Sequence, residues 1–213
     1  MRLVTERRPG RIALTAVAAI VTAILGAGPA VAATTWTVTP GGRFSGQAGT
    51  TKLEDTTDGA SLICSGSVLS GSFKAGSGLS GTGIGSITSG GKFTDCTGPT
   101  PLPYTITLRG LPWHISVTSY RDGVVRGRIS HIEITVSLGG NCSFVLDGTA
   151  AGAFDGITRF TYTDSAHTLK LLPTGASLHY YKVAGCAQIV HNGDTAGISA
   201  TYPISPAQAI TSP

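Results

Sequence analysis

The chain has 213 residues, a formal net charge of +4 and only 12% charged residues, while 30 residues are glycine. Charged residues make up about 25% of an ordinary soluble domain, so serine and threonine must supply most of the polarity here. Four arginines and one glutamate lie within the first 11 residues, which leaves a net charge of +1 for the rest. This balance excludes a strongly basic domain, and we expect no binding of nucleic acid.

Residues 1–32 have the organisation of a secretory signal peptide. A basic head precedes an apolar run over 12–25, and Ala30-Val31-Ala32 fits the small-residue pattern at which signal peptidase cuts. The run is shorter than the ~17 to 25 residues that an uncleaved membrane anchor needs. Arg7-Arg8 keeps twin-arginine export open as an alternative route. We expect secretion of residues 33–213 as a single domain, with no stable membrane insertion after cleavage.

All four cysteines lie in the exported part, at Cys64, Cys96, Cys142 and Cys186. An even number of cysteines in an exported chain predicts two disulfides, for which three pairings are possible. We favour Cys64 with Cys96 and Cys142 with Cys186, because this pairing places one bridge on either side of the central hairpin described next. Metal ligation is the rival interpretation, but the chain has no Cys-x-x-Cys pair and no cysteine–histidine cluster.

Residues 113–138 carry the strongest local signal. Two runs rich in β-branched and aromatic residues flank Asp122-Gly123, a step typical of a two-residue hairpin turn in which both residues have positive φ. This turn places His114 opposite His131. The apolar alternation changes phase in the second arm, since a two-residue period cannot keep both halves on one face. We therefore predict a β-bulge near 128–132, or a strand that passes from one sheet to another.

The rest of the exported part reads as short strands separated by turns. Further strands are expected at 36–39, 60–68, 104–108, 142–146, 178–183 and 195–202, with two arms near 160–162 and 169–171. We interpret the Gly/Ser-rich stretch 71–91 as two short strands, and we expect turns at Pro173-Thr174-Gly175 and Asn192-Gly193, the latter as a second hairpin. No helical period of useful length occurs after the leader. These features predict an all-β fold, either an antiparallel two-sheet sandwich or a flattened barrel.

Several short motifs are spread over the exported part. They are Trp36-Thr-Val-Thr-Pro-Gly-Gly42, the Pro112-Trp113 step, Tyr120, the Gly185-Cys186 pair and the closing Ala200-Thr-Tyr-Pro-Ile-Ser-Pro206. On these motifs, nearly all of residues 33–213 resembles a group of uncharacterised secreted proteins from actinobacteria, the high-GC Gram-positive bacteria. The resemblance implies export and two disulfides. It brings no activity and no functional residues, because no function is assigned to the group.

Two histidines and one glutamate of the central hairpin form a candidate metal site. In the predicted register His114 lies opposite His131, and Glu133 follows two residues later on the same face. Two imidazoles and a carboxylate on adjacent strands are ligands that zinc or copper accepts. The alternative is that all three are polar residues on the solvated face, and a bulge in this arm would disturb the pairing. We expect no cofactor.

Two pairs of neighbouring residues are candidates for a binding surface, namely Tyr120 with Arg121 and Tyr180 with Tyr181. Exposed aromatic rings stack on sugars and anchor protein partners. Because neighbouring residues in a strand point to opposite faces, one of the two adjacent tyrosines should face outward. A half-buried tyrosine, however, needs no ligand to explain it.

The sequence shows no catalytic constellation. Gly76-Ser-Gly78-Leu-Ser-Gly81 matches a dinucleotide-binding fingerprint by letter, but it lies in a Gly/Ser tract rather than between a strand and a helix. Asp155, Asp164 and Asp194 are interpreted as turn formers. We therefore expect a non-enzymatic extracellular or cell-envelope module that contacts a protein or a glycan. The alternative is an extracellular hydrolase or metal-dependent enzyme whose residues converge only in three dimensions.

Overall fold

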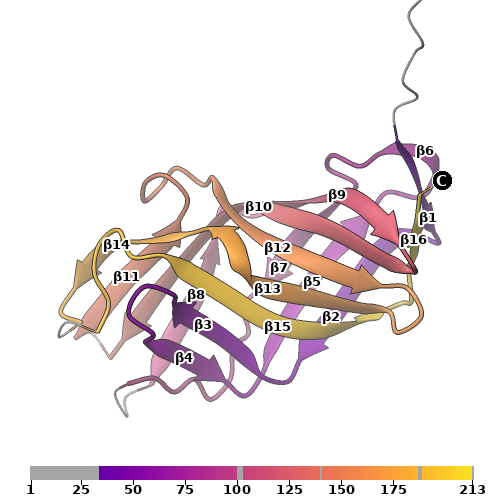
Figure 1. Cartoon of the computed structure of the whole chain (residues 1–213). Helices are drawn as coiled ribbons and strands as arrows, with labels where there is room; N and C mark the ends of the chain where they lie inside the picture. Colours follow the sequence, from indigo (N-terminus) through magenta and orange to yellow (C-terminus); the bar gives the residue numbers. More distant parts are fainter. Residues whose placement is uncertain (1–33, 100–102, 140, 187–188, 213) are drawn as a thin grey trace, which may run out of the picture. The chain divides into compact units, whose positions relative to one another are not determined.

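The computed structural model describes residues 34–99, 103–139, 141–186 and 189–212, so the predicted signal peptide and its cleavage site lie outside the described residues. All regular structure in these segments is β-strand (Figure 1). The strands are β1 (Thr35–Thr39), β2 (Gly42–Ala48), β3 (Thr51–Asp55), β4 (Ser61–Cys64), β5 (Ser67–Phe73), β6 (Gly76–Ser80), β7 (Gly85–Gly90), β8 (Tyr104–Arg109), β9 (Trp113–Arg121), β10 (Val124–Leu138), β11 (Cys142–Asp147), β12 (Gly156–Thr163), β13 (Thr168–Ser177), β14 (His179–Ala184), β15 (Ala196–Ser205) and β16 (Ala209–Thr211). In the described part of the chain, no helix is long and apolar enough to cross a membrane.

Eight strands close into a barrel. They follow the hydrogen-bonded order β12, β13, β15, β2, β5, β7, β9 and β10, and β10 then pairs with β12 to complete the ring. Every pairing in the ring is antiparallel. A ring of eight strands encloses an interior that side chains can fill. The structure thus confirms the predicted all-β class and takes the barrel form, with further sheets added to it.

Glycines facing phenylalanines allow the barrel strands to approach one another closely. The cross-strand pairs are Phe44 with Gly71, Phe73 with Gly85, and Phe160 with Gly127. A Cβ atom at Gly71 would lie 2.8 Å from the Phe44 ring, and one at Gly127 would lie 2.5 Å from the Phe160 ring. The ring therefore fills the space that a side chain on the facing strand would need. Part of the high glycine content has this packing role.

Strand β10 belongs to two sheets. Its first half pairs with β9 and β12 in the barrel, while its second half, from Glu133 to Leu138, pairs with β8 and β11. Strand β14 extends this second sheet beyond β11. The change of partners follows a β-bulge between Ser130 and Ile132, where His131 has a φ of 68°. Both predicted consequences of the phase change are confirmed, because the bulge redirects the strand into the second sheet.

Strand β15 also serves two sheets. Its first residues, Ala196–Ala200, pair with β3, which pairs in turn with β4, and its later residues pair with β13 and β2. The segment that leads into β15 contacts β14 through a bridge between His179 and Thr195 and through backbone hydrogen bonds of Tyr180. The two long strands β10 and β15 therefore hold the added sheets onto the barrel.

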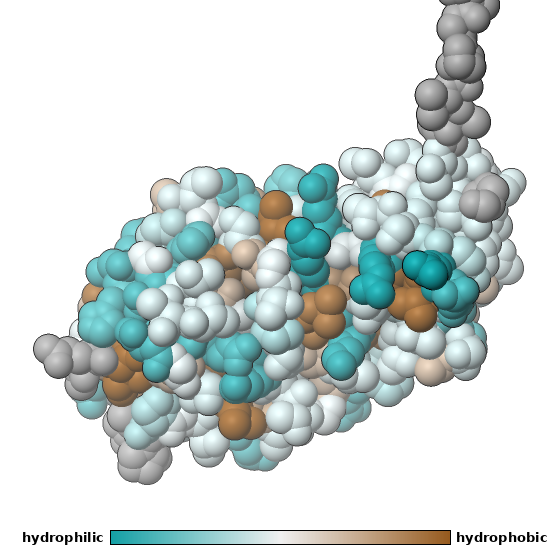
Figure 2. Space-filling model, in the orientation of Figure 1, coloured by the Kyte–Doolittle hydropathy of each residue, from teal (hydrophilic) through white to brown (hydrophobic). Residues whose placement is uncertain are grey.

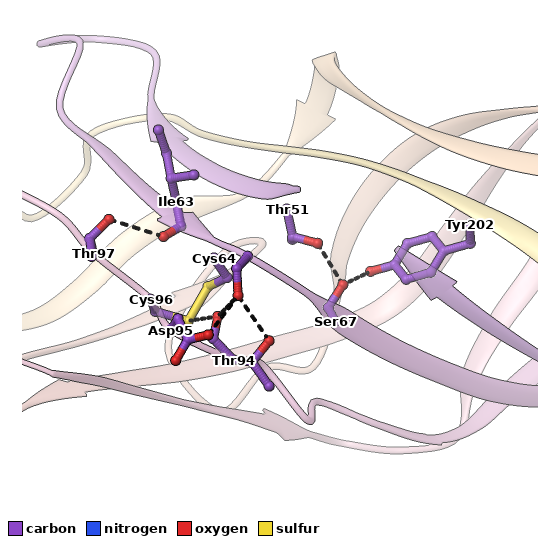
Figure 3. The surroundings of a disulfide bond; sticks show 10 residues. Thr51, Ile63, Cys64, Ser67, Thr94, Asp95, Cys96, Thr97 and Tyr202 are labelled. Carbon is purple, nitrogen blue, oxygen red and sulfur yellow. Dashed lines mark hydrogen bonds between the residues drawn. A yellow bond between two sulfur atoms is a disulfide. The ribbon is translucent and has the colours of Figure 1, made fainter. Parts of the chain in front are cut away.

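Both predicted disulfides are present, and both lie in the added sheets. Cys64, the last residue of β4, is bonded to Cys96 (Figure 3). Thr97, the neighbour of Cys96, exchanges backbone hydrogen bonds with Ile63. Cys142 of β11 is bonded to Cys186, which follows β14. The bridges close loops of 32 and 44 residues, for which chain entropy gives a stabilisation of about 3 to 4 kcal/mol each. Two structural disulfides fit an oxidising compartment such as the extracellular space.

A separate sheet of β16, β1 and β6 is fastened to the barrel through Gln208. The hydroxyl of Tyr162, in β12, donates a hydrogen bond of 2.7 Å to the backbone oxygen of Gln208. The side-chain oxygen of Gln208 accepts a hydrogen bond of 3.0 Å from the backbone N–H of Gly41. Burial raises the pKa of Tyr162 to about 12. This buried polar contact ties the segment before β16 to the barrel wall.

Three local predictions are wrong. The stretch Pro173-Thr174-Gly175 lies within β13. The register with β12 shifts here, so that β13 has three more residues than β12 between two successive cross-strand pairs, Arg159 with Leu172 and Ile157 with Ser177. Proline has no N–H for the ladder, so this stretch bulges out of the pairing instead of reversing the chain. The single strand expected at 60–68 is two strands. Asn192-Gly193 forms a turn, but the flanking segments fold back on β14 and make no two-residue hairpin.

Candidate functional site: a cationic groove on the barrel wall

A groove of about 540 Å³ lies on the outer wall of the barrel, where β9, β10, β12 and β13 are neighbours. It is lined by Thr118, Ser119, Arg126, Gly127, Arg128, Ile157, Arg159, Phe160, Leu172, Gly175 and Ser177. In Figure 2, strongly hydrophilic side chains surround small hydrophobic patches over the region that β10, β12 and β13 occupy in Figure 1. The groove thus combines guanidinium groups and hydroxyls with an apolar floor.

Strand alternation places three arginines on this face. Burial alternates along β10, so that Arg126 and Arg128 face outward on either side of the buried Gly127. Arg159 is likewise exposed between buried neighbours in β12. The register sets Arg128 directly opposite Arg159 and Arg126 opposite Thr161. The arginines therefore form a compact cationic group across two strands.

Lys170 extends the group onto a third strand. It is exposed in β13 and lies opposite Thr161, so Arg126, Thr161 and Lys170 form one row across the wall. In the described segments, no carboxylate oxygen lies within 4.0 Å of these four cations, since the ion pairs found involve Lys52, Arg121 and His191. Like charges directly opposite one another destabilise a sheet. The Arg128–Arg159 pair therefore has a cost that the fold does not offset locally, which is typical of a functional site.

The backbone holds Arg159 in place. Its Nε atom donates a hydrogen bond of 3.0 Å to the carbonyl oxygen of Gly175. Gly175 has a φ of 70°, and a Cβ atom there would lie 2.7 Å from Nε. Only glycine permits this contact without a shift of the arginine. The anchored guanidinium keeps its terminal amino groups for a ligand, and such groups bind carboxylate, sulfate or phosphate through paired hydrogen bonds.

The residues predicted for a binding surface do not line this groove. Tyr180 is only 3% exposed and belongs to the core, because it occupies the inward face of β14. Tyr181 faces the other way, as strand alternation requires, and donates its hydroxyl hydrogen to a backbone oxygen at 2.9 Å. Tyr120 is partly buried, and Arg121 forms an exposed ion pair of 3.3 Å with Asp122 at the hairpin turn.

The residues predicted as metal ligands lie in two different surroundings. The register predicted for the histidines is wrong by one residue, because an irregularity between Arg126 and Gly127 sets Ser130 opposite His114. The rings of His114 and His131 still lie 4.3 Å apart. Glu133 follows the bulge at His131 and is 8% exposed. It accepts a hydrogen bond of 2.7 Å from the backbone N–H of Gly152, in the loop between β11 and β12.

The loop between β11 and β12, residues 148–155, is organised by a second carboxylate. Asp147 is fully buried and accepts hydrogen bonds of 2.7 to 3.3 Å from five backbone N–H groups, those of Gly148, Gly152, Phe154, Asp155 and Gly156. Burial raises the pKa of Glu133, and the nearby Asp147 adds to this effect. A glycosidase uses two neighbouring carboxyl groups as acid and base or nucleophile. Here, however, backbone donors occupy both of them, which fits a structural role.

No protein family, curated protein or solved structure matches the chain. The function must therefore be inferred from the geometry of the site itself. A charge count over residues 33–213 hides the groove, since acidic residues elsewhere cancel the charge of its arginines. The usable signal in the sequence is the Arg-x-Arg spacing at 126–128 in a strand whose alternate residues are apolar.

Proposed function

We propose that the protein is a secreted, non-enzymatic binding module whose barrel wall binds an anionic glycan. The observation that carries the proposal is the directly opposed pair Arg128 and Arg159, which lies in an open groove without acidic partners. Bound carboxylate or sulfate groups would relieve the repulsion between these two guanidinium groups.

The spacing of the charges favours a chain-like ligand over a single small anion. Arg126, Arg128, Arg159 and Lys170 lie on three adjacent strands. Adjacent strands are about 4.8 Å apart, which is close to the distance that one sugar residue adds to a polysaccharide. The hydroxyls of Thr118 and Ser119 beside the cations match the polar surface of a sugar. A uronate-containing or sulfated chain therefore fits the groove best.

The test compares binding of polygalacturonate and heparin with binding of neutral dextran. We expect both polyanions to bind and dextran not to bind, with an affinity that falls as salt rises. The double substitution Arg128→Gln/Arg159→Gln should weaken binding at least tenfold. The matched control Lys74→Gln/Lys92→Gln removes the same charge outside the groove and should leave the affinity within about twofold. An equal loss in both double variants, or no binding of either polyanion, would refute the proposal.

A further inference from the structure

A cluster of potential metal ligands lies where the β3–β4 loop meets the segment that leads into β15. The Nδ1 atom of His191 lies 3.1 Å from a carboxylate oxygen of Asp58 and 3.4 Å from one of Asp194. One ligand atom from each of the three residues lies within 4.8 Å of the other two. Asp58 and His191 are exposed, whereas the side chain of Asp194 is only 13% exposed. The described residues contain no other trio of such groups at this spacing.

One oxygen of a buried carboxylate behind the cluster has no hydrogen-bond partner. Asp55, the last residue of β3, is 1% exposed, and its Oδ1 accepts hydrogen bonds from the N–H groups of Thr57 at 2.7 Å and Asp58 at 3.1 Å. Its Oδ2 is buried and has no hydrogen-bond partner. The side chain of Asp55 contacts that of Asp194. A buried oxygen without a hydrogen-bond partner, next to a second carboxylate, costs free energy, and a cation bound nearby would reduce this cost.

The backbone fixes the two segments to each other. The N–H of Thr56 donates to the carbonyl oxygen of Thr195 at 2.8 Å, and the N–H of Thr195 donates to the hydroxyl of Thr57 at 3.0 Å. The N–H of His191 donates to the carboxylate of Asp194 at 2.6 Å. The ligand atoms therefore lie on a preformed frame, which reduces the entropy that binding must overcome.

We propose that Asp58, His191 and Asp194 bind a divalent metal ion of the zinc class. The buried carboxylate of Asp55 lies behind Asp194 and adds negative charge near the ion. Zinc–ligand bonds of about 2.0 to 2.2 Å place tetrahedral ligands roughly 3.3 to 3.6 Å apart, close to the two separations measured from His191 Nδ1. An imidazole ligand favours zinc, copper or nickel over calcium and magnesium.

Isothermal titration calorimetry of the purified, chelator-treated protein with Zn²⁺ tests the proposal. We expect one strong site, absence of comparable binding of Ca²⁺ or Mg²⁺, and a higher melting temperature with Zn²⁺ than with EDTA. Visible absorption of bound Co²⁺ gives a second readout, because the spectrum reports the geometry and ligands of the ion.

Variants locate the ion. His191→Gln and Asp58→Asn change exposed side chains, so they should fold normally and lose measurable Zn²⁺ binding. Asp55→Asn should weaken binding about 10- to 100-fold, because it removes a negative charge next to a ligand of the ion. The matched control His114→Gln/His131→Gln removes two imidazoles on the barrel and should bind Zn²⁺ as the unaltered protein does.

Three outcomes would overturn the assignment. They are no heat at micromolar Zn²⁺, stronger binding of Ca²⁺ than of Zn²⁺, and binding that survives His191→Gln but is lost in His114→Gln/His131→Gln. The site is independent of the cationic groove, so failure of glycan binding would leave the metal assignment untouched.

Discussion

Two buried aspartates end two strands of this protein, and their surroundings differ in one respect. Asp147 ends β11 and Asp55 ends β3, with exposures of 0% and 1%. Both oxygens of Asp147 accept hydrogen bonds from the loop that follows. Asp55 uses one oxygen in the same way, and its other oxygen has no partner. An aspartate thus has both oxygens hydrogen-bonded at the end of β11, whereas at the end of β3 one oxygen has no donor from the loop.

The substitution Asp147→Asn should have the largest effect. An amide at this position turns an NH₂ group toward two or three backbone N–H groups, whichever way it is oriented, and leaves those donors unpaired. We expect a loss of about 3 to 5 kcal/mol in the free energy of unfolding, measured by urea denaturation. Asp122→Asn, at an exposed turn, is the matched control and should change stability by less than about 0.5 kcal/mol. A small loss at Asp147 would remove the contrast with Asp55.

The second-largest effect on stability is expected from Zn²⁺ binding at the proposed site beside Asp55. Binding of Zn²⁺ to the native state alone should stabilise the protein by about 2.7 kcal/mol at a concentration 100 times the dissociation constant. Chemical denaturation with Zn²⁺ and with EDTA measures this difference. The stabilisation should vanish in Asp194→Asn. A stabilisation that persists in this variant would place the ion elsewhere.

The dependence of stability on pH should contain a contribution from Glu133, the carboxyl group next to Asp147. The pKa of Glu133 in the native state is raised above its ordinary value of 4.5, chiefly by burial. The native state therefore holds this proton more tightly than the unfolded chain, so stability falls as pH rises from about 4.5 through the raised pKa. Glu133→Gln should flatten this part of the profile, which urea midpoints between about pH 4 and 7 can follow. An unchanged slope in the variant would exclude Glu133 as its source.

The smallest effect is expected for Asp55→Asn in the presence of EDTA. Here the amide can place its NH₂ group where the orphaned oxygen stood and donate to Asp194. We expect stability to stay within about 1 kcal/mol of the unaltered protein or to rise, in contrast to the same change at Asp147. Thermal melting of both variants side by side measures the contrast. A loss as large as that at Asp147 would mean that the oxygen of Asp55 already has a partner.

The sequence predicts the local architecture around the central hairpin well. Asp122 and Gly123 have φ values of 53° and 76°, as the predicted turn requires, and Tyr120 lies opposite Val125. The phase change in β10 correctly indicated a bulge. These features depend on neighbours in the chain, so periodicity and turn chemistry are sufficient to find them. Closure of the ring depends on which distant strands pair, and no local pattern encodes this.

The sites were harder to predict for the same reason. Arg128 and Arg159 become one group only through the register of β10 with β12, two strands that are not consecutive in the chain. Asp194 was correctly placed in a turn, but its relation to Asp55 requires the pairing of β3 with β15. Single residues in turns look alike in a sequence. Their chemistry differs once partners from far along the chain are beside them.

The pairing of β15 with β2 has a consequence for the timing of folding. Ser45 lies opposite Ser205, so one seam of the barrel joins residues near the two ends of the described chain. This seam cannot form until the ribosome has made the chain at least as far as Ser205. Contacts between such distant residues also slow the search for the native pairing. The ring of a nascent chain therefore stays open until β15 has been synthesised and can pair with β2.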